Sequence, residues 1–429
     1  MASAPRSGGA HRVLVGLVVF LFFAWGFGTV LNDTLIPKLK GLYSLSYTEV
    51  MLTQFCFFLS YFVFSIPAGL LLSRIGYVRG VVVGLVVMAA GCALFFPASS
   101  ADRFGAFLLA LFVIAAGMTM LQVAANPYIE LLGPESTSHS RLTLAQALNS
   151  FATFVGPRVG AVLLLRSGVT LDATGLSPQA LHTLRVGETQ AIAWPYLGMA
   201  AILLALAFVF WTFRASKAPP VSRQADLGGV FALLNRPRLA LGAVAIFIYV
   251  GAEVSIGSVM INYLMQPTVL GAVAERAGTL VSYYWGGAMV GRFVGAFVLR
   301  VVKPGFALAA CAVGACILAA TSSFSMGGFA AWTLIAVGLC NSIMFPTIFS
   351  LATEQLGEQT PNGSGLLCMA IVGGAIVPVI TGAVADRTSL ATSLLVPAVC
   401  YIGIIVYGIL AARGLGLKAL VPAAGRVAV

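Results

Sequence analysis

The sequence predicts an all-α integral membrane protein with twelve transmembrane helices in two pseudo-symmetric six-helix bundles. Its 429 residues are 60% hydrophobic and only 9% charged, too few charges for the surface of a water-soluble globule. Apolar runs of about 20 residues, long enough to cross about 30 Å of hydrocarbon as helices, recur along the chain. Several features of the first half recur in the second half, which predicts an internal repeat.

The twelve predicted spans follow one another with short polar connections. We interpret the first span as a retained helix rather than a signal peptide, because it runs straight into Asn32-Asp33 without a small-residue cleavage site. The predicted spans are 13–37, 46–72, 79–98, 104–130, 142–166, 191–213, 238–264, 275–300, 305–322, 328–352, 363–383 and 391–412.

The longest polar interruption between spans divides the chain into halves. Residues 214–237 include Pro219-Pro220 and separate the first six spans from the last six. We therefore predict an N-terminal six-helix bundle over 1–213, a cytoplasmic linker over 214–237 and a C-terminal six-helix bundle over 238–429.

Short sequence echoes predict that the two bundles are repeats. Gly69 is followed five residues later by Arg74, and Gly295 is followed five residues later by Arg300. The two glycines lie 226 residues apart (295 − 69). Further echoes pair Asn126-Pro127 with Phe345-Pro346, and Pro157 with Pro378. Two parallel six-helix repeats with a substrate path between them resemble the plan of the major facilitator superfamily.

The net charge of +11 fits membrane topology better than nucleic-acid binding. The basic residues are scattered over short loops, without the clustered patch that nucleic acid requires. With both termini inside, roughly 15 of the 24 lysines and arginines fall on the cytoplasmic side and about seven outside. This excess follows the positive-inside rule and predicts that both termini are cytoplasmic.

Residue patterns for enzyme, metal or cofactor chemistry are missing from the sequence. The seven cysteines all lie in apolar spans and are interpreted as small buried hydrophobic residues. The three histidines are isolated, with no partner at metal-ligand spacing. There is no Ser-His-Asp candidate, cofactor fingerprint or ATP-binding motif. We predict a protein that is not an enzyme, has no cofactor and draws on a gradient.

Polar side chains inside the spans are the candidates for a solute path, because each is costly in hydrocarbon. Gln122 and Asn126 are four residues apart and Gln146 and Asn149 are three apart, so each pair shares a helix face. Amides both donate and accept, which suits sugar hydroxyl groups; interhelical hydrogen bonding is the alternative. The candidate sugar ligands, aromatic residues included, are Asn32, Gln122, Asn126, Gln146, Asn149, Tyr249, Tyr283, Trp285, Asn341 and Phe345.

Two carboxyl groups inside the spans are candidates for proton coupling. Asp33 lies in the outer part of the first span, and Glu253 lies near the middle of the seventh. Low dielectric favours the protonated carboxyl, so each group can bind and release a proton as its exposure changes. The alternative for Asp33 is a carboxylate at a loop edge. For Glu253 the alternatives are sugar binding and a structural hydrogen bond.

Four arginines are predicted to act in gating or orientation rather than in sugar binding. Arg74, Arg292 and Arg300 belong to the positively charged cytoplasmic side. Arg158 interrupts the apolar outer half of span 142–166, where a bare guanidinium is expensive. We hypothesise that Arg158 hinders closure of the outer side. The alternative is that it snorkels to the outer headgroups.

Sequence motifs along nearly all twelve spans resemble the fucose:proton symporter family of major facilitators. The motifs are NDTLIP from Asn32, AANPYIELLGPES from Ala124, HSRLTLAQALNS from His139, YVGAEVSIGS from Tyr249 and YYWGGAMVGRFVG from Tyr283. The resemblance implies that Asp33 matches the aspartate assigned to proton coupling, and that Gln146 and Asn149 line the sugar cavity. Gln122 stands where the fucose symporter has a glutamate, which is similar to the glucose, galactose and N-acetylglucosamine branch.

Together the residues and the resemblance predict a monosaccharide importer that works by proton-coupled alternating access in the bacterial inner membrane. Glucose, galactose or N-acetylglucosamine is favoured over fucose as the substrate. We expect sugar, protons and membrane lipid as partners, no nucleic acid, and a functional monomer. The alternatives are an uncoupled sugar facilitator, a proton-coupled drug exporter and, in a different class, a membrane sugar sensor that does not transport.

Overall fold

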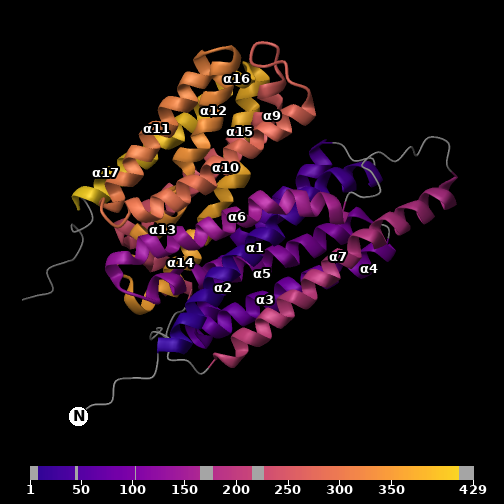
Figure 1. Cartoon of the computed structure of the whole chain (residues 1–429). Coiled ribbons are helices and arrows are strands. Elements are labelled where there is room, and N and C mark those ends of the chain that lie inside the picture. The colour runs from indigo at the N-terminus through magenta and orange to yellow at the C-terminus, as the bar shows by residue number, and fades with distance from the viewer. Residues whose placement is uncertain (1–7, 44–46, 102, 165–176, 215–226, 415–429) are drawn as a thin grey trace, which may run out of the picture. The chain divides into compact units, whose positions relative to one another are not determined.

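The computed structural model describes residues 8–43, 47–101, 103–164, 177–214 and 227–414, and every regular element within these ranges is a helix (Figure 1). Nine helices of this described part are long and apolar enough to cross a membrane, and Val13–Thr29 forms a shorter apolar helix. Joined across short breaks, the helices make twelve spans, which confirms the predicted fold class. Helices satisfy their own backbone hydrogen bonds, as the hydrocarbon of a membrane requires.

The chain divides into two compact units. Unit 1 comprises Met1–Gly133 and Ala145–Ser222, and unit 2 comprises Pro134–Leu144 and Arg223–Val429. The helix that begins at Ser138 therefore starts in unit 2 and continues in unit 1. Residues 215–226, half of the expected linker, lie outside the described residues, so its boundaries stay a prediction.

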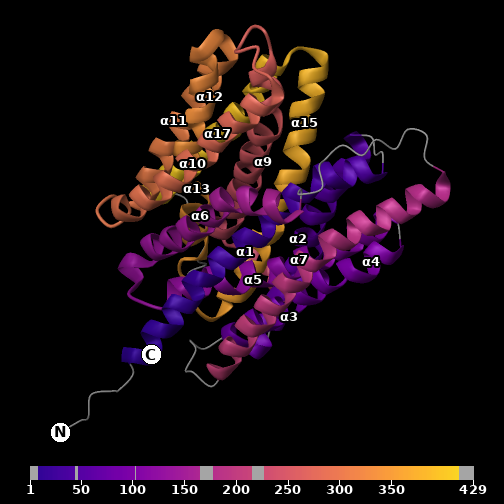
Figure 2. The ribbon, with the colours of Figure 1, turned by 45° about the vertical axis from the view of Figure 1, so that its right-hand side comes forward.

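Unit 1 contains the first six spans. Its helix α3 lies along α5 and α7, and α5 also packs against α2 (Figure 2). A Cβ atom added to Gly117 of α5 would lie 2.4 Å from the Met88 backbone nitrogen of α3, so only glycine permits this approach. The helices are α1 (Gly8–Tyr43), α2 (Tyr47–Ile75), α3 (Tyr77–Ala93), α4 (Phe95–Ala101), α5 (Phe104–Leu131), α6 (Ser138–Leu164) and α7 (Pro178–Thr212).

Unit 2 contains the last six spans, and three of these are interrupted. Helix α11 lies along α17 and α12, while α9 packs against α10, α13, α15 and α17 (Figure 1). The helices are α8 (Leu227–Ala232), α9 (Pro237–Met265), α10 (Ala274–Val298), α11 (Pro304–Phe324), α12 (Gly327–Asn341), α13 (Met344–Thr353), α14 (Thr360–Met369), α15 (Gly373–Arg387), α16 (Leu390–Ser393) and α17 (Leu395–Arg413).

Close packing of α10 and α12 places the polar residues of unit 2 next to one another. A Cβ atom on Gly338 of α12 would lie 2.1 Å from the Tyr284 carbonyl oxygen of α10. Because glycine lets the two backbones approach, Asn341, one turn beyond Gly338, comes within reach of the Tyr284 side chain.

Candidate functional site

Unit 1 brings together three of the predicted sugar ligands on α5 and α6. Gln146 Nε2 donates to Asn126 Oδ1 over 3.4 Å, joining the two helices, and both side chains are buried. Gln122 lies one turn before Asn126 on α5 and is partly buried. One member of each pair that the sequence placed on a common helix face thus meets a member of the other pair across α5 and α6.

Two amide atoms of this group lack a partner among the described residues. These are the acceptor Gln122 Oε1 and the donor Asn126 Nδ2, both fully removed from solvent. Buried polar groups in proteins are nearly always hydrogen-bonded, so an unmet donor and an unmet acceptor one turn apart are candidate ligand contacts. Hydroxyl groups both donate and accept, so they have the chemistry that such a pair of amide atoms requires.

Asn149 ties α6 to α1. Its Nδ2 donates to the Phe22 carbonyl oxygen over 2.9 Å, and a Cβ atom on Gly26 would lie 2.6 Å from the Asn149 side chain. Gly26 therefore leaves the space that Asn149 occupies. This hydrogen bond fixes α1, the helix that contains Asp33, against α6. Asn149 thus makes the kind of interhelical hydrogen bond that was the alternative to sugar binding.

Three predicted site residues of unit 1 have side chains outside the described part of the structure. These are Asn32 and Asp33 of α1 and Arg158 of α6. Their roles stay predictions. Arg74, by contrast, is described: it is exposed in the last turn of α2, with its charge at the C-terminal end of the helix.

Unit 2 contains a buried hydrogen-bond network centred on Asn341. The Asn341 amide donates from Nδ2 to the Tyr284 hydroxyl over 2.8 Å and accepts at Oδ1 from the Tyr401 hydroxyl over 2.8 Å. The Tyr249 hydroxyl lies 3.1 Å from the Asn341 carbonyl oxygen and 2.8 Å from Glu253 Oε1. Asn341 and the three tyrosines are fully buried, while Glu253 is partly buried.

The remaining aromatic candidates lie around this network rather than in it. Tyr283 and Trp285 are exposed, with 56% and 37% of their surface accessible. Trp285 meets the edge of Tyr284 at 5.0 Å between ring centroids, and the partly buried Phe345 stacks on Phe349. Tyr283 and Trp285 are the chain neighbours of Tyr284, and Phe345 lies one turn after Asn341.

Arg292, predicted to act at the cytoplasmic gate, lies against the interruption between α12 and α13. Its Nε donates to the Ser342 carbonyl oxygen over 3.0 Å. Pro346 explains why this oxygen is available, because proline has no N–H group for the carbonyl four residues earlier. Arg292 therefore supplies the donor that the helix itself lacks.

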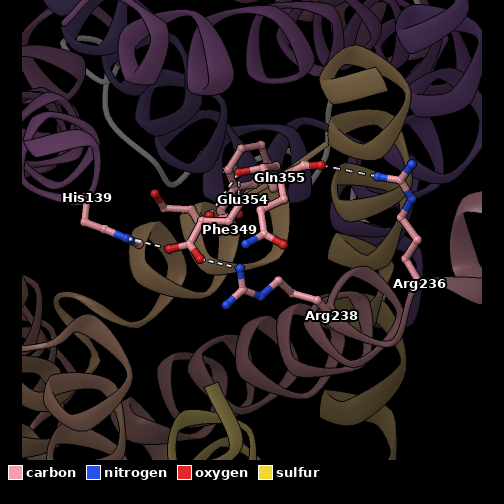
Figure 3. A network of polar contacts seen from close by, with 8 residues as sticks. His139, Arg236, Arg238, Phe349, Glu354 and Gln355 are labelled. Carbon is pink, nitrogen blue, oxygen red and sulfur yellow. Dashed lines mark hydrogen bonds and ion pairs between the residues drawn. The ribbon is translucent and has the colours of Figure 1, made fainter. Parts of the chain in front are cut away.

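A second polar cluster joins the start of α6 to the ends of α9 and α13 within unit 2 (Figure 3). Figure 3 shows Glu354 between His139 and Arg238, with His139 Nε2 at 3.1 Å from Glu354 Oε1. Arg238 pairs with the other carboxylate oxygen, Glu354 Oε2. Arg236 donates to the Gln355 carbonyl oxygen over 3.4 Å.

Arg300 belongs to the same end of unit 2. Its Nε donates to the Ser140 hydroxyl over 3.2 Å, and that hydroxyl donates to the Ala296 carbonyl oxygen over 2.6 Å. The predicted gating residue thus holds the segment that contains His139. We call His139, Ser140, Arg238, Arg300 and Glu354 the Glu354 cluster.

Sequence reasoning missed Tyr401 and most of the Glu354 cluster. Tyr401 could have been found as a tyrosine in an apolar span, because a buried hydroxyl group needs a partner. Glu354 could have been found as the acidic residue next to a span end, where the surrounding charges are mainly basic. His139 belongs to the motif HSRLTLAQALNS, but none of its sequence neighbours indicated its partner.

The Glu354 cluster leads to a stability prediction. Glu354→Gln removes the charge that His139 and Arg238 share, and the loss of one partly exposed charged contact costs about 1–2 kcal/mol. We expect a thermal unfolding midpoint several degrees lower for the purified variant. The matched control is Glu358→Gln, since Glu358 is exposed four residues later. Equal midpoints for the two variants would contradict a stabilising role for the Glu354 cluster.

Twelve helical spans with polar groups buried among them are typical of a membrane transporter, and the comparisons with known proteins give its family. Residues 14–378 match the profile of the Major Facilitator Superfamily, and the chain belongs to this superfamily. The family consists of transporters, which confirms that the chain is not an enzyme.

Relatives of this chain transport sugars according to their names. The chain is 48% identical over 399 residues to the glucose/galactose transporter of Brucella abortus (strain 9-941), covering 92% of this chain and 93% of the relative. It is 36% identical over 416 residues to the L-fucose-proton symporter of Escherichia coli (strain K12), covering 93% of each. The crystal structure of the Escherichia coli fucose:proton symporter matches with a TM-score of 0.85 and 32% identity, covering 94% of this chain and 99% of that one. The resemblance inferred from the motifs is confirmed.

Proposed function

We propose that this chain is a proton-coupled symporter that imports glucose or galactose across the bacterial inner membrane, with both termini in the cytoplasm. The unmet pair of Gln122 Oε1 and Asn126 Nδ2 is the observation that supports a hydroxyl-rich substrate. The higher identity to a glucose/galactose transporter than to a fucose symporter, 48% against 36%, supports the choice of sugar.

Sugar recognition is proposed to use the amides of unit 1. Gln146 is bonded to Asn126, so it fixes the orientation of that amide for the sugar. The aromatic rings of Trp285 and Phe345 offer faces for the C–H surface of a hexose. Gln122 has no charge where the fucose branch has a glutamate, which leaves a neutral donor and acceptor for the sugar.

Proton coupling is proposed at Asp33 and Glu253, one carboxyl in each unit. Protonation removes the charge of a carboxyl and so changes which conformations are favourable in a dry surrounding. Sugar and proton enter together from outside, the two six-helix bundles alternate their access, and release inside resets the carrier. Arg74, Arg292, Arg300 and Arg158 are proposed to set the relative stability of the alternating states, and the carrier to act as a monomer.

Uptake into proteoliposomes tests this function. Labelled glucose, galactose, N-acetylglucosamine and fucose are offered to the purified chain with and without an inward proton gradient. The proposal expects accumulation of glucose or galactose only with the gradient. Uptake that ignores the gradient would identify a facilitator, and uptake of none of these sugars would refute the substrate. Reduced accumulation of several unrelated dyes would identify a drug exporter, and sugar binding without flux a sensor.

A further inference from the structure

The interruption of the span Gly327–Thr353 has a definite chemical cause. Helix α12 ends at Asn341 and α13 begins at Met344. Pro346 cannot donate to the Ser342 carbonyl four residues earlier, and its ring displaces that carbonyl from the helix. Lipid offers no replacement donor, so the carbonyl groups at this break need donors from other helices.

Two side chains from neighbouring helices supply those donors. Arg292 Nε of α10 lies 3.0 Å from the Ser342 carbonyl oxygen. The Tyr249 hydroxyl of α9 lies 3.1 Å from the Asn341 carbonyl oxygen. The break is therefore held from two sides, and one of the two holding groups also contacts a carboxyl group.

The Tyr249 hydroxyl faces two acceptors with a single hydrogen. Glu253 Oε1 lies 2.8 Å from it, and the Asn341 carbonyl oxygen lies 3.1 Å from it. An ionised carboxylate is the stronger acceptor and takes this hydrogen. A protonated Glu253 has its own O–H to donate to the Tyr249 oxygen, which leaves the tyrosine hydrogen for the Asn341 carbonyl.

We propose that Tyr249 is a positioning residue that transmits the protonation of Glu253 to the Pro346 break. When Glu253 is protonated, the Tyr249 hydroxyl donates to the Asn341 carbonyl and stabilises the break. When Glu253 is ionised, the hydroxyl donates to the carboxylate instead, and the break loses this hydrogen bond. The inference rests on the proposed function only in taking Glu253 as a group that titrates. It does not depend on which sugar is carried.

The charged and titratable groups around Glu253 fit this role. Helices α12, α13 and α14 contain no charged side chain, and α15 has its charges only at the last two positions. The groups whose charge or ionisation interacts with Glu253 are Tyr249 of α9, Tyr284 and Arg292 of α10, and Tyr401 of α17. Arg292 is the one full charge among them, and it is bonded to the break itself.

Movement at the break falls on α13 rather than on α12. The Asn341 side chain at the end of α12 is fixed by Tyr284 and Tyr401. Helix α13 is ten residues long and ends at Thr353, next to Glu354 of the Glu354 cluster. A rigid helix of this length spans about 15 Å. Loosening the break therefore frees the element that carries Glu354.

Hydrogen exchange tests the inference without relying on transport. Peptides covering residues 339–347 are followed by mass spectrometry at several pH values in wild type, Tyr249→Phe and Glu253→Gln, after correction for chemical exchange rates. Wild type is expected to exchange roughly fivefold faster once Glu253 is ionised, as the loss of one hydrogen bond predicts. Glu253→Gln is expected to lose this pH dependence, and Tyr249→Phe to lose it while exchanging fast at every pH.

Tyr263→Phe is the matched control on the same helix. Tyr263 also donates a buried hydroxyl to a carbonyl, that of Ser322 at 2.7 Å, but it contacts neither Glu253 nor the break. This control is expected to keep the wild-type pH dependence. A wild type without pH dependence, or a pH dependence retained in either Tyr249→Phe or Glu253→Gln, would overturn the inference.

The two proposals fail in distinguishable ways. Failure of sugar uptake to respond to a proton gradient refutes the proposed coupling, and a pH-dependent break that responds to both substitutions still supports the inference. If uptake is driven by protons but hydrogen exchange at the break does not depend on pH, only the inference is refuted. Glu253→Gln preserves the size of the side chain, so it serves as the deciding variant if Tyr249→Phe does not fold.

Discussion

Asp33→Asn is expected to abolish proton-driven accumulation of sugar while exchange of sugar across the membrane continues. The amide keeps the size and polarity of the carboxyl group but cannot release a proton at any working pH. A gradient of one pH unit supplies about 1.4 kcal/mol per proton, enough for roughly tenfold accumulation at one proton per sugar. Proteoliposome uptake with and without the gradient measures this accumulation, and counterflow of labelled sugar measures exchange.

The control for this experiment is Asp386→Asn. Asp386 is an exposed aspartate near the end of α15, so its substitution makes the same chemical change away from the proposed coupling site. We expect its accumulation to equal that of wild type. Accumulation retained in Asp33→Asn would show that another carboxyl group couples the proton, and Glu253 would be the first to examine.

Asn126→Ala is expected to weaken sugar binding by roughly tenfold. The substitution removes the unmet donor Nδ2 and also the acceptor that Gln146 uses, so a sugar hydroxyl and the Gln146 amide each lose a partner. Each buried hydrogen bond contributes about 0.5–1.5 kcal/mol, and about 1.4 kcal/mol corresponds to a tenfold change in affinity. Equilibrium binding of glucose and galactose to the purified protein measures the effect.

Thr119→Ala is the matched control for sugar binding. Thr119 is a buried polar residue of the same helix, but its hydroxyl donates to the Ala115 carbonyl of that helix over 2.8 Å. The control therefore removes a buried polar group that is already satisfied. Wild-type affinity in Asn126→Ala, or an equal loss in Thr119→Ala, would indicate that the α5 amides only hold helices together.

The location of each span could be predicted from the sequence because the solvent of the protein is lipid. The predicted span 104–130 corresponds to Phe104–Leu131, and the predicted span 328–352 corresponds to Gly327–Thr353. Long apolar runs and the shortage of intramembrane polar groups are local properties of a chain. The amides on α5 and α6 could be selected in the same way, since residues three and four apart share a helix face.

The partners of the polar residues were decided only by the tertiary structure. Asn341 meets Tyr401 across 60 residues, and His139 meets Glu354 across 215. In a membrane, the lipid-facing and helix-facing sides of a span are similarly apolar, so no hydrophobic stripe marks the neighbour of a helix. The sequence by itself therefore determined the twelve spans, the transporter class and most candidate site residues. The tertiary structure alone decided which of them share hydrogen bonds, because those contacts depend on how separate helices pack.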